Sequence, residues 1–316
     1  MSVQVSAPVA ARVAWSRVGL YYGIALGGAA LVAVLLRVVS PLAGAWSTLV
    51  IQLGAAVLYM PLPLVAGLVV ERRNGRVPLL RREWQRLRTE FWPTFGRSAG
   101  YAVLVMVAIL ALGFGVAWLA GALGVPGAGH LVTSDAEFRA RMMEIVPGMS
   151  ADTPLPPAAV VATGGIIQGL LAGLTINALF AFGEEYGWRG VLAEELRPLG
   201  TVRANLLTGV LWGLWHAPII MLGHNYGAEW GWGIPMMVLW TTPLAFLLSW
   251  VRDRSGSVLA PSFLHGAYNG TIGFYVFLLI GGNTFVAPPM GFLMVLVLTV
   301  LAVVVHRLPA RTPARA

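Results

Sequence analysis

Long apolar stretches alternate with short, arginine-bearing segments along the whole chain. A helix needs about 20 mainly apolar residues to cross a bilayer. Stretches of this kind lie at residues 18–38, 47–70, 99–123, 159–183, 204–222, 232–251, 257–280 and 287–306. The pattern predicts an all-α membrane protein, a polytopic bundle of about eight transmembrane helices.

The segment 79–95 has a different pattern. Leu80, Trp84, Leu87 and Phe91 recur at helical spacing, with arginines between them. A helix with one apolar and one basic face is typical of the membrane interface. We therefore expect a cytoplasmic interfacial amphipathic helix. It serves either as an anchor on anionic lipid or as a docking site for substrate.

The longest connection on the other side of the membrane is residues 124–158. It contains Ser134-Asp135-Ala136-Glu137, the spacing of a capping box, in which a serine and a glutamate satisfy the first backbone N–H groups of a helix. A short helix is expected there. The PLPP segment at 154–157 ends it before the fourth stretch.

Composition agrees with membrane insertion. The chain is 58% hydrophobic and 11% charged, with a mean hydropathy of +0.77, whereas soluble domains carry roughly 25% charged residues. Cysteine is absent, which excludes disulfides, a thiolate nucleophile and cysteine metal ligands. All 21 basic residues are arginine, a bias that suggests a bacterial protein. Because the arginines flank apolar spans, we expect membrane lipid and no nucleic acid as a partner.

The arginines also set the orientation. If the N-terminus is inside and the chain crosses eight times, 18 of the 21 arginines lie on the cytoplasmic side. The exceptions are Arg37, Arg139 and Arg141. Cytoplasmic loops carry an excess of Lys and Arg. We therefore expect a multi-pass protein of the plasma membrane with both termini in the cytoplasm.

Two carboxylates and a guanidinium close the fourth stretch, in the segment LFAFGEEYGWRG at residues 179–190. On a helix, Glu185 and Arg189 share a face, whereas Glu184 is rotated by about 100° from Glu185. The spacing predicts that Arg189 holds Glu185 and that Glu184 is freer to act as a general acid or base. A solvated helix cap at the membrane edge would explain the same residues.

The fifth stretch contains one histidine, His216, with Trp212 one turn before it. Gly209 and Gly213 are spaced to allow the close approach of a neighbouring helix. Pro218 is expected to bend the helix or to free backbone carbonyls near His216. A packing histidine is the alternative to a catalytic one.

The seventh stretch contains His265 and Asn269, four residues apart and therefore on one helical face. An asparagine amide and a neutral histidine can both donate hydrogen bonds. Two convergent donors in a dry site resemble an oxyanion hole. Hydrogen bonding between helices is the alternative, since Asn and His serve this role in membranes.

Polar clusters on three spans are costly to leave unpaired in hydrocarbon, so we expect them to meet. Together they could polarise water and stabilise an oxyanion, which is the chemistry of acyl-bond hydrolysis. Ser257 and Ser262 lie near His265, but no Gly-x-Ser-x-Gly elbow is present. Two histidines and a glutamate could bind zinc, although the chain has no His-Glu-x-x-His motif.

Three motifs in this order resemble the CPBP family, which contains CAAX prenyl endopeptidases and bacteriocin-processing enzymes and is also called the Abi family. They are Glu-Glu-x-x-x-Arg at 184–189, aromatic-x-x-x-His at 212–216 and His-x-x-x-Asn at 265–269. The resemblance covers roughly residues 159–306. Trp212 departs from the pattern, since the family more often has Phe there.

The resemblance implies an intramembrane glutamate-type endopeptidase that acts on a membrane-associated peptide or protein. In the family, the residues that correspond to Glu184 and His216 activate water, and those corresponding to His265 and Asn269 form the oxyanion hole. Glu185 and Arg189 would orient the site. We expect attack on the peptide carbonyl near the cytoplasmic face, with no cofactor and with zinc as a minor alternative.

The expected organisation is a three-span region at 1–158, a five-span catalytic core at 159–306 and a cytoplasmic tail at 307–316. A non-catalytic scaffold or bacteriocin-immunity protein remains a second hypothesis, in which the polar clusters only hold helices together. A transporter is a weaker third, because the sequence lacks paired interrupted spans in matching halves. Neither the substrate nor an oligomeric state can be predicted from the chain.

Overall fold

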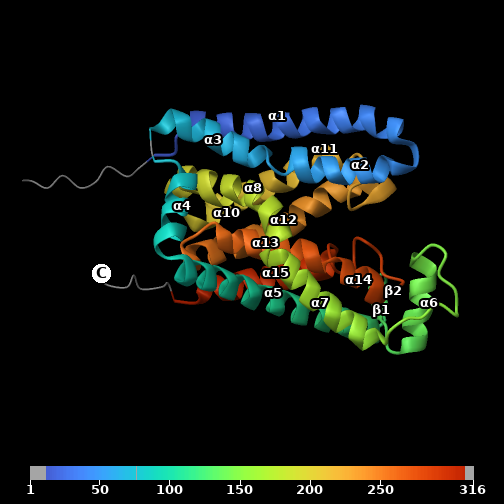
Figure 1. The fold of residues 1–316 in the computed structure, drawn as a ribbon. Coiled ribbons are helices and arrows are strands. Elements are labelled where there is room, and N and C mark those ends of the chain that lie inside the picture. Colours follow the sequence, from blue (N-terminus) through green and yellow to red (C-terminus); the bar gives the residue numbers. More distant parts are fainter. Residues whose placement is uncertain (1–11, 76, 310–316) are drawn as a thin grey trace, which may run out of the picture.

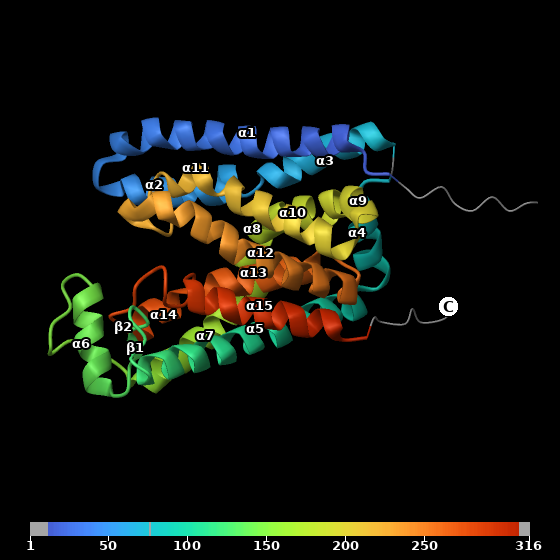
Figure 2. The ribbon, with the colours of Figure 1, turned by 180° about the vertical axis from the view of Figure 1, so that it is seen from behind.

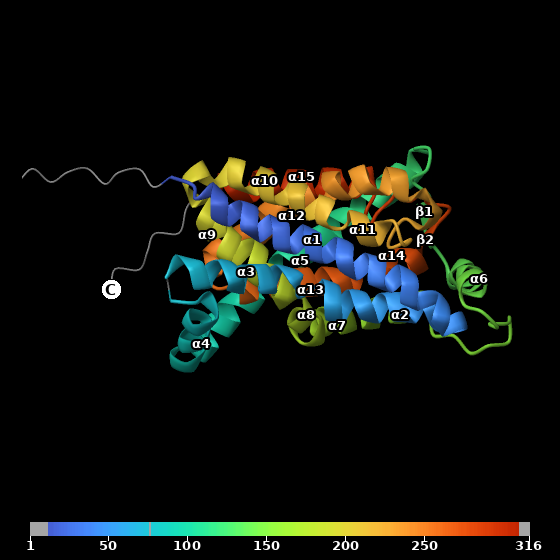
Figure 3. The same cartoon turned by 90° about the horizontal axis from the view of Figure 1, so that it is seen from above.

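The computed structural model describes residues 12–75 and 77–309, and their long helices lie side by side in one bundle (Figure 1). The described ends of the chain lie at the end of the bundle that carries α4, whereas α6 and a short sheet lie at the other end (Figures 1, 2 and 3). The elements of the first half are α1 (Trp15–Val39), η1 (Ser40–Trp46), α2 (Ser47–Gly54), η2 (Ala55–Tyr59), α3 (Leu62–Asn74), α4 (Leu79–Thr89), α5 (Phe91–Ala122), β1 (His130–Leu131) and α6 (Asp135–Ile145).

The second half contains the polar clusters of the spans. Its elements are α7 (Ala158–Leu174), α8 (Ile176–Glu185), η3 (Tyr186–Leu192), α9 (Ala193–Leu196), η4 (Arg197–Leu199), α10 (Gly200–Trp215), α11 (Ala217–Ile220), η5 (Gly227–Glu229), α12 (Trp230–Ser255), α13 (Leu259–Thr271), α14 (Gly273–Leu278), β2 (Leu279–Ile280) and α15 (Phe292–Arg307).

The chain is an all-α membrane protein apart from the two-residue antiparallel pair β1–β2. Within the described residues, three helical stretches are long and apolar enough to cross a membrane, Trp15–Arg73, Phe91–Ala122 and Gly227–Ser255. A fourth is present if the bent pair Ala158–Leu174 and Ile176–Ile220 forms one span. The first stretch contains α1 and the returning α2 and α3, which lie beside α1. Multi-pass insertion is therefore a property of the fold.

The fourth predicted span is not one straight helix. α7 and α8 meet at Thr175, where the backbone leaves helical values at φ −126° and ψ −99°, and the two helices are bent by 50°. α13 packs against both of them as well as against α5 and α12. The break thus turns α8 so that its last residues lie against α13, the most central helix.

Small residues permit this packing. A Cβ atom at Gly173 would overlap the backbone of Ala267, and one at Gly266 would lie 2.7 Å from the backbone N of Ala178. Asn177 Nδ2 donates to Gly266 O at 3.2 Å. Since no side chain separates the helices at these points, α13 is held at a fixed height against the joint between α7 and α8.

The predicted close approach at Gly209 and Gly213 is confirmed, and the partner helix is α12. A Cβ atom at Gly209 would lie 2.6 Å from Thr242 Cα, and one at Gly213 would lie 2.5 Å from Val238 Cα. Thr241 Oγ1 donates to Gly209 O at 2.9 Å. α10 is therefore fixed to α12 along the part that leads to His216.

The amphipathic helix is shorter than predicted. α4 ends at Thr89, since Glu90 has φ −136° and ψ 49°, and Phe91 begins α5 instead of extending α4. Leu80 and Trp84 are exposed, whereas Leu79 and Glu83 are buried. The apolar spacing identified the helix, but it could not identify the one-residue break at Glu90 before the next span.

The capping box before α6 is half formed. Ser134 Oγ accepts the Glu137 N–H at 3.2 Å, as predicted. The Glu137 carboxylate accepts instead from Thr133 N at 2.8 Å and lies 2.6 Å from His130 Nε2. Glu137 therefore connects α6 to strand β1 instead of closing the box.

Candidate active site

The first polar cluster lies inside the bundle. Glu184 and Glu185 end α8, and the chain continues through the π-helical segment η3, whose seven residues are all buried. The exposed fraction is 2% for Glu184, 0% for Glu185 and 1% for Arg189. A solvated cap at the membrane edge is therefore the wrong reading of these residues, because the helix does not end where the apolar stretch ends.

The predicted pair of Glu185 and Arg189 is present. Arg189 Nη1 donates to Glu185 Oε1 at 3.0 Å, and His265 Nδ1 lies 2.8 Å from the same oxygen. Buried charges need partners of this kind. Because Arg189 Nη1 donates to Glu185 Oε1, this oxygen is an acceptor, and the proton between Glu185 and His265 lies on His265 Nδ1.

His216 lies where α10 gives way to α11. Its N–H bonds to Gly213 O instead of Trp212 O, and Pro218 supplies no N–H to the following turn. The Trp212 carbonyl lies 2.8 Å from His216 Nδ1. A carbonyl can only accept, so Nδ1 carries the proton and the neutral ring has its lone pair on Nε2. The predicted effect of the proline is thus confirmed.

Trp212 contacts residues of all three motifs. Its Nε1–H donates to Glu184 Oε2 at 2.9 Å, and Arg189 Cζ lies 4.2 Å from the centre of its ring. Its ring centre lies 5.5 Å from that of His265 and 5.7 Å from that of His216. The spacing predicted Trp212 only as an aromatic neighbour of His216. Its bond to Glu184 depends on the relative rotation of α8 and α10, which spacing within one helix does not specify.

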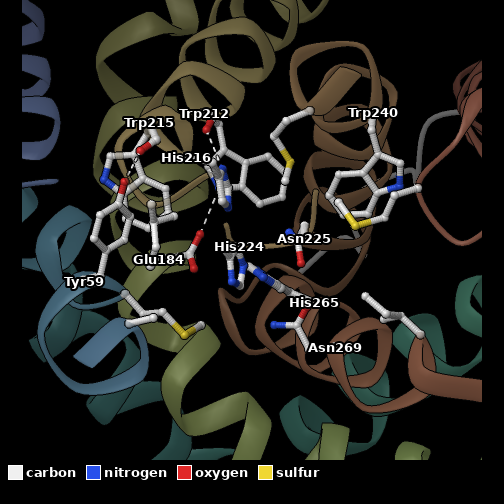
Figure 4. Close-up of a pocket in the computed structure, with 16 residues that line it drawn as sticks. Tyr59, Glu184, Trp212, Trp215, His216, His224, Asn225, Trp240, His265 and Asn269 are labelled. Carbon is white, nitrogen blue, oxygen red and sulfur yellow. Dashed lines mark hydrogen bonds between the residues drawn. The ribbon is translucent and has the colours of Figure 1, made fainter. Parts of the chain in front are cut away.

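The three clusters meet at one pocket of about 270 Å³ (Figure 4). Four residues from α8, α13 and the end of α10 line it, namely Glu184, His216, His265 and Asn269. Glu185 and Arg189 do not line this pocket. They lie behind its wall, where Glu185 binds His265.

Further residues of the pocket were missed by sequence reasoning. Tyr59 of η2 donates through its hydroxyl to Trp215 O, and Trp240 of α12 donates to Tyr268 OH at 3.2 Å. His224 and Asn225, in the turn after α11, line the pocket as well. Asn225 has a positive φ of 64°, a conformation that asparagine tolerates better than most residues. No spacing along the chain links these residues to the three motifs.

The contact with Glu185 changes the role predicted for His265. A neutral ring whose Nδ1–H is directed at Glu185 presents an acceptor at Nε2, not a donor. His265 can donate to an oxyanion only when both nitrogens carry protons. Asn269 has no such restriction, because its amide always has two N–H groups.

A metal-binding arrangement is not formed by the described residues. Among them, no group of three or more His, Asp or Glu side chains is placed to hold one metal ion. Glu185 Oε1 already binds Arg189 and His265. Nδ1 of His216 faces Trp212 O, and Nδ1 of His265 faces Glu185 Oε1, so neither Nδ1 atom is available to a metal ion. The donor set present does not fit zinc in this geometry.

Comparison with known proteins places this site in a recognised family. Residues 166–271 match the family model of the type II CAAX prenyl endopeptidase Rce1-like domain. CAAX prenyl protease 2 of Methanococcus maripaludis is 30% identical to the chain over 100 residues. That match covers 28% of this chain and 36% of the archaeal protein.

All three motifs, from Glu184 to Asn269, fall within the matched residues 166–271. The site geometry, the family match and the archaeal relative therefore agree on one assignment. Residues 166–271 are therefore similar to an Rce1-like domain, and the three motifs that they contain resemble those of the CPBP family.

Proposed function

We propose that the chain is an intramembrane endopeptidase of the glutamate type, which hydrolyses peptide bonds of a membrane-associated peptide or protein with an activated water. The observation that carries this proposal is that Glu184, His216, His265 and Asn269, from three separate spans, line one pocket. The name of the archaeal relative, CAAX prenyl protease 2, supports the reaction class.

Water activation is assigned to Glu184 and His216. With its Nδ1–H directed at Trp212 O, neutral His216 can accept a hydrogen bond from water at Nε2. Glu184 accepts from Trp212 through Oε2, and a carboxylate has further lone pairs that can accept from the same water. Water held by two acceptors is oriented with its oxygen lone pair toward a bound carbonyl.

The hydrolytic steps follow from these positions. Glu184 takes a proton from the water as the water oxygen attacks the peptide carbonyl carbon. The carbonyl oxygen thereby becomes an oxyanion. Asn269 Nδ2–H and the Nε2–H of doubly protonated His265 donate to it. The C–N bond then breaks, the proton passes from Glu184 to the leaving amine, and a carboxyl group and an amine are released.

Glu185 and Arg189 act as positioning residues. Glu185 fixes His265 through Nδ1, which leaves Nε2 for the oxyanion step. Arg189 in turn holds Glu185. Neither residue lines the pocket, so neither needs to touch substrate.

For the whole protein we infer eight membrane crossings, with both termini in the cytoplasm of a cell bounded by a plasma membrane. The course of α1, α2 with α3, α5, α7 with α8, α10, α12, α13 with α14, and α15 supports this count (Figures 1 and 2). We keep the division into a three-span region (1–158), a catalytic core (159–306) and a tail (307–316). Membrane lipid and the peptide substrate are the proposed partners.

The proposal is tested with Glu184→Gln, which removes the base but keeps the size of the side chain. Loss of a general base should lower kcat by about 10²–10⁴-fold. The measurement is cleavage of a quenched-fluorescent peptide library by purified protein in nanodiscs. Glu229→Gln, an exposed glutamate at the start of α12, is the matched control and should cleave at the wild-type rate. Equal rates for wild type and Glu184→Gln would sink the assignment.

The same variants distinguish the competing hypotheses. A scaffold or immunity protein predicts no cleavage by wild type, and loss of folding when the polar clusters are changed. A zinc-dependent protease predicts that a chelator abolishes cleavage and that added zinc restores it. We expect folded, inactive Glu184→Gln protein and cleavage that is insensitive to chelation.

A further inference from the structure

The pocket has a mouth at one end of the bundle. Its outer wall is formed by His224 and Asn225 in the turn between α11 and α12, by Ile272 after α13, and by Met290 before α15. These connections lie at the α6 end of the molecule, opposite α4 (Figures 1 and 2). The catalytic pocket therefore faces the connections at that end.

A second cavity lies beside the catalytic pocket, toward the α6 end. It has a volume of about 510 Å³ and shares Asn225, Ile272 and Met290 with the catalytic pocket. Its remaining walls come from Arg141 and Glu144 of α6, from Tyr275 and Val276 of α14, and from residues within 279–289. The two cavities therefore adjoin at three shared residues, on the side of the catalytic pocket that faces the α6 end.

The α4 end is closed by packed protein. All seven residues of η3 are buried directly after Glu185. Glu71 of α3 accepts from Leu79 N at 2.6 Å and from the Tyr186 hydroxyl. Glu83 of α4 accepts from the Ser257 hydroxyl, in the connection just before α13. These buried bonds fasten α4 over the end of the bundle.

A third cavity, of about 600 Å³, enters from the α4 end but stops short of the catalytic pocket. Arg189 lines it and Trp212 lines the catalytic pocket. Arg189 Cζ lies 4.2 Å from the Trp212 ring centre, and Arg189 and Trp212 are each 1% exposed. One stacked layer therefore separates water at the α4 end from the catalytic residues.

The distribution of arginines indicates which end of the bundle is cytoplasmic and which is external. Of the arginines that the structure describes, only Arg37, Arg139 and Arg141 belong to segments at the α6 end; the others lie on the tails, on α4 and on the connections at its end. Since arginine-rich connections stay in the cytoplasm, the closed end is the cytoplasmic one and the open end is external.

We propose that substrate reaches the catalytic pocket from the external face, so that the substrates are exported or membrane-anchored peptides whose cleavage site lies on that side of the membrane. The inference rests on the proposed protease function for its substrate. It differs from the sequence-based expectation of attack near the cytoplasmic face, which took Glu184 to lie at the cytoplasmic edge of its span.

The absence of cysteine makes the direction of access measurable with single cysteines. Asn225→Cys marks the mouth of the catalytic pocket, and Thr201→Cys marks the cavity at the α4 end. Spheroplasts expressing either variant are treated with a membrane-impermeant maleimide before and after permeabilisation. We expect Asn225→Cys to be labelled in intact spheroplasts and Thr201→Cys only after permeabilisation. The reverse pattern, or labelling of both in intact spheroplasts, would overturn the inference.

An activity assay separates failure of the inference from failure of the proposed function. Sealed right-side-out and inside-out vesicles are given an impermeant quenched-fluorescent peptide library outside, with detergent-opened vesicles as the reference. We expect cleavage by right-side-out and opened vesicles, and at least about tenfold less by sealed inside-out vesicles, since a sealed membrane blocks charged peptides. Cleavage by sealed inside-out vesicles refutes external access alone. No cleavage by opened vesicles refutes the protease, while the labelling result still decides which end is open.

Discussion

At the residue scale, the role of each histidine in the site depends on which of its two ring nitrogens already has a hydrogen-bond partner in the protein. His216 and His265 both present Nε2 to the pocket because Nδ1 of each faces a protein acceptor, Trp212 O or Glu185 Oε1. Their roles nevertheless differ. With the Trp212 carbonyl as the partner of Nδ1, His216 can accept from water at Nε2, whereas His265, held by Glu185, is assigned to donate to the oxyanion. The two histidines thus have different proposed roles, water activation for His216 and stabilisation of the oxyanion for His265.

Trp212→Phe tests how far Glu184 depends on its indole donor. The variant keeps an aromatic ring but removes the bond from Nε1 to Glu184 Oε2. Hydrogen bonds to charged groups contribute about 1.5–3 kcal/mol, so we expect kcat to fall by about 10- to 100-fold with little change in KM. Steady-state cleavage of the selected peptide measures both constants.

The control is Trp240→Phe, in the same pocket. It also removes an indole donor, but that donor bonds to Tyr268 OH and not to Glu184. A merely structural contribution of Trp212 would lower thermal stability and leave kcat of the folded fraction unchanged. An equal loss of kcat in both variants would contradict the specific role of Trp212.

At the element scale, helix breaks place the catalytic residues. The hydrophobic pattern located the spans, since an apolar stretch is a matter of composition. It could not locate the breaks at Thr175 and at His216, because backbone direction there depends on contacts with distant helices. Pro218 was a local signal and was interpreted correctly. Thr175 has no comparable signal in its neighbours; its break accompanies the contact of Gly173 with Ala267.

In the site, too, contacts within one helix could be predicted from the sequence, whereas contacts between helices could not. Intrahelical spacing predicted the pair of Glu185 and Arg189, which are four residues apart. The bond from His265 to Glu185 spans 80 residues, and the pocket wall at Tyr59 comes from a span without any motif. Such contacts follow from the rotation of whole helices about their axes, which hydropathy does not specify.

Gly173→Ala tests the contact between α7 and α13. The added Cβ would overlap backbone atoms of Ala267, which cannot move aside as a side chain could. Overpacking of this kind costs about 1–3 kcal/mol, so we expect a lower unfolding temperature and a loss of cleavage, since α13 carries His265.

Gly164→Ala on the same helix is the matched control for Gly173→Ala. A Cβ there meets nothing within 4 Å, and alanine favours helix over glycine by up to about 1 kcal/mol. Its unfolding temperature should equal or exceed that of wild type. If both variants were equally stable, close packing at Gly173 would not hold the helices together.

Glu137 predicts a pH dependence of α6. Bonds from Thr133 N–H, His130 and the Thr133 hydroxyl lower the pKa of Glu137 below its usual 4.5. A lowered pKa in the folded state stabilises the fold above pH 4.5, and this contribution is lost as the pH falls through the lowered pKa.

The measurement is hydrogen exchange of residues 130–145 in wild type and Glu137→Gln. The variant should exchange faster at about pH 7, and the ratio of the two rates should approach one as the pH falls below the lowered pKa, where the protonated acid resembles the amide. A ratio that does not change with pH would exclude the charge of Glu137 as the cause.

At the scale of the whole molecule, the arginine-rich segments and the opening of the catalytic pocket lie at opposite ends of the bundle. The arginine-rich end is fastened by α4, and the catalytic pocket faces the α6 end. α4 exposes Trp84 and Leu80 together with Arg81 and Arg88. This surface can hold the closed end against the lipid interface while leaving the pocket at the opposite end unobstructed.

Replacing Arg81 and Arg88 together by Gln decides between the two roles of α4. An interfacial arginine gains about 1 kcal/mol from anionic lipid, so the variant should lose most of the extra thermal stability that wild type gains in phosphatidylglycerol nanodiscs over phosphatidylcholine nanodiscs. The double change to Lys keeps the charge and should behave as wild type. A substrate-docking helix predicts the contrary, an unchanged lipid effect with a higher KM for peptide. We expect the stabilisation by phosphatidylglycerol to decrease and the KM for peptide to stay unchanged, because the proposed entrance to the catalytic pocket lies at the other end of the molecule.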